Sequence, residues 1–157
     1  MSQTYGVVNI DLRPDGTLLV HVMARTTEGA MILSGLPKVL TDADDDISLG
    51  QTVMAATDEA ASTVLPARDL RHNPPDAELL EWLKLPSYAA YAKGVREVKV
   101  HGFYEAGALT HVLVTPAHNG GARSGFTPLT DHRVRLDSPT AAQLGAAVQE
   151  AFALATL

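Results

Sequence analysis

The sequence predicts an α+β fold: a single domain over residues 1–157, with a largely antiparallel β-sheet of two hairpins plus a further strand and helices packed on one face. Strand-like and helix-like segments occur in separate runs along the chain, which is the pattern of α+β proteins. The 157 residues, 46% of them apolar, fit one domain with a substantial core, and no linker-like stretch divides them.

The first hairpin is predicted over residues 5–13 and 17–25. Both segments are rich in β-branched residues and partly alternate between apolar and polar positions. Pro14-Asp15-Gly16 between them has turn chemistry, and its glycine tolerates positive φ. These segments therefore open the predicted sheet.

Two helices are expected in the next part of the chain. The residues from Asp44 to Asp46 and Ser48 offer N-caps and negative charge ahead of an apolar run, which predicts a helix over about 49–62. A short helix over 77–83 follows, with Asp76 as its cap.

A second hairpin is predicted over 95–104 and 108–115, joined by a turn at residues 105–107. Residues 118–125 contain three glycines and are predicted to be a flexible loop. The segment 126–136 supplies the further strand.

A final helix is expected over 141–155, capped by Ser138 or Thr140. Its pattern repeats that of the first helix: Leu49-Gly50-x-x-Val53-x-x-Ala56-x-x-x-Ala60 recurs as Leu144-Gly145-x-x-Val148-x-x-Ala151-x-x-x-Ala155. On a helix these offsets place small and apolar residues on one stripe, and glycine permits close approach of another backbone. We predict that the two helices pack in the core by this face; a duplication or a ligand-binding stripe is the alternative.

The negative charge is concentrated in one quarter of the chain. Between positions 42 and 81 there are ten acidic and two basic residues, a formal charge of 2 − 10 = −8, against −6 for the whole protein. A one-signed region attracts an oppositely charged surface, so it favours a basic protein partner and disfavours nucleic acid. An ordinary solvated face is the alternative. The predicted partner-binding residues are Asp42, Asp44, Asp45, Asp46, Asp58, Glu59, Asp69, Asp76, Glu78 and Glu81.

Trp82, Tyr88 and Tyr91 form an aromatic concentration beside this acidic segment. Aromatic side chains of this kind anchor interfaces because they bury a large area at low entropic cost. We predict that Trp82 belongs to the core, with an interface role as the alternative.

The residues carry no recognised catalytic or metal-binding pattern. The sequence has no cysteine, no P-loop, no Gly-x-Ser-x-Gly elbow and no His-x-x-x-His on a helix. His21, His101 and His111 lie inside predicted strands, where we expect hydrogen-bonded sheet residues. The enzymatic alternative is that one region of the chain assembles acid–base or metal chemistry. Its residues would be His118, Arg123, Ser124, Asp131 and His132. We predict no catalytic residue, no metal and no cofactor.

The N-terminal residues lack the basic head and apolar run of a signal peptide, and no stretch approaches the roughly 18 apolar residues of a membrane span. We therefore expect a cytoplasmic protein that does not bind membranes.

The arrangement resembles a family of immunity proteins from bacterial contact-dependent growth inhibition (CDI) systems. The resemblance spans about residues 40 to 157 and rests on Leu49-Gly50 at a helix start, Trp82, the run Val112-Leu113-Val114-Thr115-Pro116 and the closing Leu144-Gly145-Ala146-Ala147-Val148. It implies a cytoplasmic, non-catalytic inhibitor that binds the C-terminal toxin domain of its cognate effector, commonly a nuclease. The family carries no shared catalytic motif.

The leading hypothesis is thus a toxin inhibitor whose partner presents a basic surface, as a nuclease must in order to bind phosphate. A secretion chaperone or adaptor is the first alternative, and would be a stable homodimer that binds an unfolded segment of its client. A small hydrolase or metal-binding enzyme that uses the region from His118 to His132 is the second. The sequence leaves the oligomeric state open.

Overall fold

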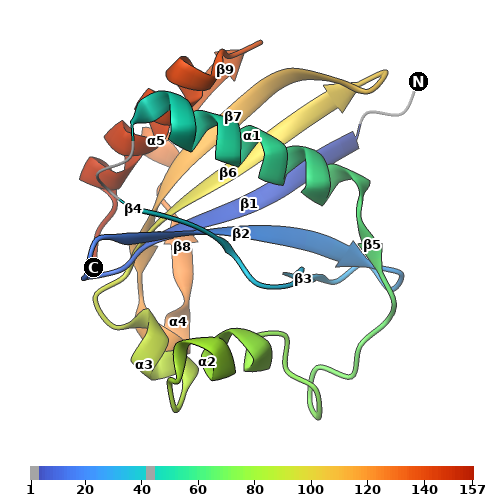
Figure 1. Cartoon of the computed structure of the whole chain (residues 1–157), viewed down its shortest axis with the longest axis vertical. Coiled ribbons are helices and arrows are strands. Elements are labelled where there is room, and N and C mark those ends of the chain that lie inside the picture. Colours follow the sequence, from blue (N-terminus) through green and yellow to red (C-terminus); the bar gives the residue numbers. More distant parts are fainter. Residues whose placement is uncertain (1–3, 42–44) are drawn as a thin grey trace.

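A computed structural model describes residues 4–41 and 45–157 of the chain. One curled, mostly antiparallel sheet dominates the molecule (Figure 1), and its strands run in the order β3 (Met31–Leu33), β2 (Thr17–Thr26), β1 (Thr4–Leu12), β6 (Arg96–Glu105), β7 (Ala108–Asn119), β8 (Phe126–Pro128). Two further strands, β4 (Lys38–Thr41) and β5 (Val64–Leu65), also pair with β2, and β9 (Val134–Asp137) pairs with β7. The predicted fold class is confirmed.

The two predicted hairpins supply the centre of the sheet. β1 and β2 turn at Gly16, whose φ is 87°, and β6 and β7 turn at Ala106 and Gly107, both at positive φ. The hairpins join through the antiparallel pairing of β1 with β6, which places Gly6 opposite Gly102. Only β5 runs parallel to its neighbour among the strands described.

Two long helices, α1 (Asp46–Ser62) and α5 (Ala141–Leu154), cover one face of this sheet (Figure 1). A Cβ atom added to Gly50 would lie 1.8 Å from the carbonyl oxygen of Ala141, and one added to Gly145 would lie 1.8 Å from that of Asp46. The backbone of the first residue of each helix therefore packs directly against the glycine of the other helix. The predicted close packing of the two matching helices is confirmed.

The main core lies between these helices and the sheet. It contains the repeated apolar stripe of both helices as far as Ala60 and Ala151, together with inward residues of the strands, among them Val8, Val20 and Val100. Ala155, predicted as the last residue of the final helix, is its extended C-cap. A second, smaller cluster lies on the other face, where Leu19 packs with two short helices, α2 (Ala77–Leu83) and α3 (Tyr88–Ala92). The expectation that the helices pack on one face therefore holds for α1 and α5 but not for this pair. Since both faces of β2 are covered, most of its residues are buried.

The prediction that Trp82 belongs to the core is wrong, because its side chain is 43% exposed. The helix α2 has the predicted bounds, and it directs Leu79, Leu80 and Leu83 toward the second cluster instead. Asp76 occupies the N-cap position but makes no capping hydrogen bond with its side chain.

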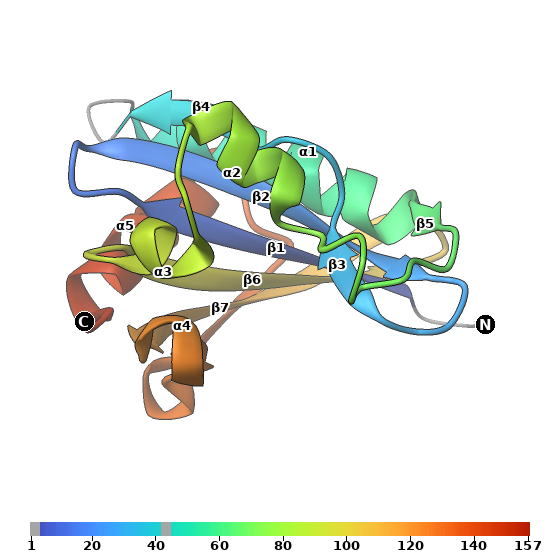
Figure 2. The same cartoon turned by 90° about the horizontal axis from the view of Figure 1, so that it is seen from below.

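The segment predicted as a flexible loop, residues 118–125, is also ordered differently. The strand β7 continues to Asn119, and a single helical turn, α4 (Gly121–Ser124), follows it on the side of the sheet opposite α1 (Figure 2). The Asn119 side chain fixes this arrangement: its Nδ2 donates to the carbonyls of Ala92 and Val95, at 2.7 and 2.8 Å.

The further strand predicted over 126–136 is present as two short pieces. β8 pairs with the end of β7 and β9 with its middle, along the same edge. A 3-10 turn over Thr130–His132 interrupts them, and next to it Arg133 Nε donates to Thr115 Oγ1 at 2.9 Å.

Candidate functional site: acidic surfaces and a buried acidic pocket

The predicted acidic residues of α1 lie near its two ends. Asp45 and Asp46 are exposed at the start of the helix, where the backbone N–H of Ser48 donates to Asp45 Oδ1 at 2.7 Å and lowers the pKa of Asp45 below its ordinary value. Asp58 and Glu59 are exposed near the other end, about 18 Å away by the rise of a helix. We call these four residues the α1 acidic surface.

Two members of this surface already have partners in the fold. The hydroxyl of Tyr104 donates to the Asp58 carboxylate, and Lys38 Nζ lies 3.3 Å from Glu59 Oε2. Compared with Asp58 and Glu59, the cap residue Asp45 and its neighbour Asp46 therefore present more of their negative charge to solvent. Asp42 and Asp44, also predicted as binding residues, lie outside the described residues.

The remaining predicted acids lie elsewhere on the molecule. Asp69 is exposed before α2 and pairs with His72, at 2.7 Å from its Nδ1, a contact that lowers the pKa of Asp69. Asp76, Glu78 and Glu81 form an α2 acidic surface, and the sheet separates it from α1 (Figure 1). The acidic segment, continuous in sequence, is therefore divided between two surfaces.

The residues of the enzymatic alternative lie on the end of β7, on α4 and on the 3-10 turn. Arg123, Ser124, Asp131 and His132 are all exposed, as is His118, whose Nδ1 lies 2.7 Å from Thr156 Oγ1. Within residues 4–41 and 45–157, no group of three or more histidine or acidic side chains is arranged to hold a metal ion. Across the same residues, the helices are too short or too polar to traverse a bilayer.

A pocket that the sequence did not predict lies between the sheet and the α2–α3 pair. Its volume is about 310 Å³, and its polar end is formed by Asp11 of β1, His21 of β2 and Glu97 of β6. These residues are 3%, 3% and 4% exposed. A partial signal was present in the sequence, because Asp11 and His21 each lie between two apolar residues of a predicted strand. Glu97 follows Arg96 and had no such signal.

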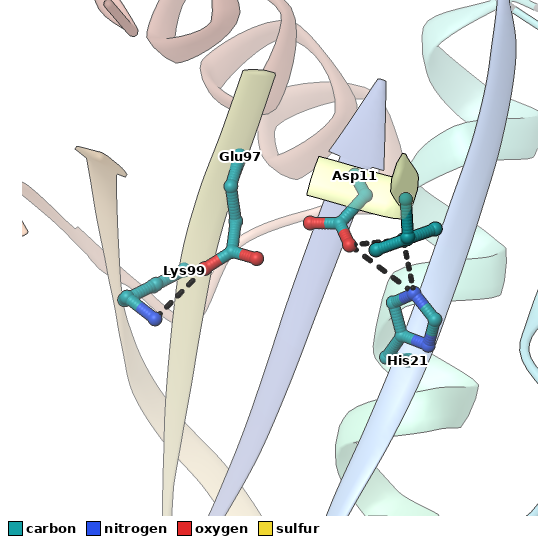
Figure 3. A network of polar contacts seen from close by, with 5 residues as sticks. Asp11, His21, Glu97 and Lys99 are labelled. Carbon is teal, nitrogen blue, oxygen red and sulfur yellow. Dashed lines mark hydrogen bonds and ion pairs between the residues drawn. The ribbon is translucent and has the colours of Figure 1, made fainter. Parts of the chain in front are cut away.

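A compact network holds these groups (Figure 3). The hydroxyl of Tyr91 donates to the Asp11 carboxylate, whose Oδ2 lies 3.2 Å from His21 Nε2. The carboxyl groups of Asp11 and Glu97 point toward one another, and Lys99 Nζ lies 2.8 Å from Glu97 Oε1. This pairing confirms the expectation that His21 is a hydrogen-bonded sheet residue, as its Nε2 is also 3.0 Å from the Tyr91 hydroxyl.

Burial sets the protonation of this network. Burial raises the pKa of Asp11, and it raises the pKa of Glu97 by a larger amount. The neighbouring charge of Asp11 also raises the pKa of Glu97. Burial lowers the pKa of His21 to about 4, so the imidazole is neutral at physiological pH. The buried Asp11 Oδ1 has no hydrogen-bond partner among the described residues. Two neighbouring buried carboxyl groups with raised pKa values favour the state in which one of them is protonated.

Comparison with known proteins identifies the fold. No protein-family model matches the sequence, and no curated protein matches it significantly. A solved protein of unknown function from Neisseria meningitidis superposes with a TM-score of 0.68 at 13% sequence identity, over 98% of this chain and 96% of that one. A chain of the CdiA-CT/CdiI toxin and immunity complex from Yersinia pseudotuberculosis superposes with a TM-score of 0.66 at 12% identity, over 99% of this chain and 98% of that one. At these identities the likeness establishes a shared fold.

Proposed function

We propose that this protein is an immunity protein of a contact-dependent growth inhibition system, and that it binds and neutralises the C-terminal toxin domain of its cognate effector. The observation that carries the proposal is the end-to-end likeness to a chain of the CdiA-CT/CdiI toxin and immunity complex, which covers 99% of this chain. It agrees with the resemblance that the sequence itself suggested.

The proposed inhibitor acts by binding and carries out no reaction of its own. The residues considered for catalysis, from His118 to His132, are exposed and lie on three different elements, which supports this part of the proposal. In this reading it works in the cytoplasm, where an incoming toxin domain would reach its target.

The proposed partner is a basic domain, and we infer a nuclease. A nuclease presents positive charge to the phosphates of its substrate, and the exposed Asp45 and Asp46 would attract such a surface from a distance. The α2 acidic surface offers a second approach. Because the two lie on different sides of the sheet, we propose that only one of them faces the toxin at a time.

Co-expression tests the proposal. The C-terminal domain encoded by the adjacent upstream reading frame is produced from an inducible promoter, with and without this protein. We expect growth arrest without it, survival with it, and a stable complex of the two purified chains. A domain that is harmless, or one that kills equally in the presence of the folded protein, would overturn the proposal.

A further inference from the structure

The buried acidic pocket combines negative charge with a deficit of donors. Its walls present carboxyl groups from three elements, Asp11 of β1, Glu97 of β6 and Asp76 at the start of α2, while Lys99 is the single cation paired with them among the described residues. His21 contributes a neutral imidazole. The buried oxygens Asn9 Oδ1 and Asp11 Oδ1 have no hydrogen-bond partner from any donor in the described chain.

The rest of the pocket is apolar and aromatic. Leu79 of α2 and Met23, Met31 and Leu33 of the strands line it, and Tyr88 stands beside Tyr91 with the ring centroids 5.7 Å apart. Tyrosine faces and thioethers attract cations and accommodate alkyl chains. All three carboxyl-bearing residues line the same pocket as Tyr88. Burial raises the pKa of Tyr88, and the charges of these three carboxyl groups raise it further.

We propose that this pocket binds an organic cation, an alkylammonium or alkylguanidinium group, with its charged head at Asp11 and Glu97 and its alkyl stem along Leu79 and Met23. The head supplies the donors that the two buried oxygens lack, and the carboxylates give it charge-assisted hydrogen bonds. The volume of about 310 Å³ admits a short stem of this kind.

Cation binding should change the protonation of Asp11 and Glu97. Burial raises the pKa of both carboxyl groups, which favours a proton on one of them before binding, and Lys99 pairs with Glu97. The incoming cation stabilises both carboxylates, so the proton leaves to solvent as the cation enters. Binding therefore releases up to one proton and weakens as the pH falls.

Two sources could supply this group. One is a lysine or arginine side chain of the basic toxin domain, a reading that rests on the proposed function; the other is a free amine or guanidine. Both sources place the same cationic group in the pocket. Binding of a small cation to the preformed toxin complex distinguishes the two sources.

The first arm of the test uses the protein alone. It is titrated calorimetrically with n-butylguanidinium and n-butylammonium, and with neutral n-butanol, in two buffers of different ionisation enthalpy. We expect the cations to bind with a dissociation constant of about 1 mM or lower and to release protons. Equal binding of butanol, no binding of either cation, or binding without proton release would overturn the proposal. This arm stands even if the immunity function fails.

Three variants localise the site. Glu97→Gln should weaken cation binding at least about tenfold and abolish proton release. Asp76→Asn, at the less buried rim of the pocket, should weaken cation binding about threefold. Because Asp76 is less buried than Glu97, this variant can test the site even if Glu97→Gln does not fold. Glu78→Gln, two residues further along α2 and outside the pocket, is the matched control and should bind as the parent does. Folded variants with unchanged affinity would refute the site.

The second arm identifies the source. If the toxin supplies the cation, a preformed complex should no longer bind n-butylguanidinium, and Asp76→Asn should weaken toxin binding. If a free molecule is the ligand, the complex should bind the probe as the free protein does.

Discussion

The reciprocal contact between Gly50 and Gly145 yields a quantitative prediction. In each helix an added methyl group would stand 1.8 Å from a backbone oxygen of the other, whereas real Cβ atoms do not approach closer than 3.0 Å. Gly→Ala at either position must therefore move α1 and α5 apart by about 3.0 − 1.8 = 1.2 Å. A radial gap of this size forfeits about half or more of the attraction between atoms in contact.

The expected cost is the difference between two effects. Overpacking costs about 1–3 kcal/mol, and a clash with backbone atoms places these variants in the upper part of that range, at about 2–3 kcal/mol. Alanine favours a helix interior over glycine by about 1 kcal/mol. We expect Gly50→Ala and Gly145→Ala each to lose about 1–2 kcal/mol of unfolding free energy, a fall in Tm of roughly 2–8 °C for a domain of this size. One separation of the helices relieves both clashes, so the double variant should lose less than the sum.

Urea unfolding followed by circular dichroism measures these changes. Ala55→Gly, at an exposed position of the same helix, calibrates the intrinsic preference. Partner binding should fall only in proportion to unfolding. Glycine variants as stable as the parent, or losses that add fully, would refute the close reciprocal contact. A stable Gly145→Ala protein that cannot bind would make the stripe a functional surface.

Exchanging Asp45 for Ser, which keeps a cap, and Asp46 for Asn should slow association with the toxin domain more than it speeds dissociation. On-rates measured at several salt concentrations check this, and an unchanged on-rate would place the interface elsewhere. A protein with both His118 and His132 replaced by Ala should protect cells as the parent does; lost protection in a folded double variant would indicate chemistry there. The folded protein keeps His21 neutral down to about pH 4, whereas the unfolded chain takes up a proton near 6.5. As the pH falls from 6.5 to 4, the parent should therefore lose about 3 kcal/mol more of its unfolding free energy than the His21→Gln variant does. The same dependence of unfolding free energy on pH in both proteins would contradict this.

Local signals predicted the hairpins and the paired helices. Gly16 and Gly107 occupy turns at positive φ, and the glycines of both helices accept a neighbouring backbone. Such features depend on a few adjacent residues, so the sequence displays them directly. The strands β3 and β5, of three and two residues, have no comparable signal, because pairing with β2 alone defines them.

The pocket and the division of the acidic segment could not be predicted in the same way. Asp11 and Glu97 meet because β1 pairs with β6, a register that neither strand displays by itself. The charge run from Asp45 to Glu81 looks like one surface in sequence, yet it passes from one side of the sheet to the other. Charge patterning predicts attraction to a partner but does not place the residues in space.

The packing of α1 against α5 also has a consequence during translation. In a nascent chain α1 exposes its apolar stripe, including Leu49 and Val53, until α5 has been synthesised roughly 80 residues later. At ribosomal rates of about 5–20 residues per second, this takes about 4 to 16 s. During that interval the surfaces of α1 and the sheet that α5 will bury stay exposed. A chaperone at the ribosome exit could therefore bind the apolar stripe of α1. Ribosome-bound chains stopped before Ala141 should be sensitive to protease at this helix.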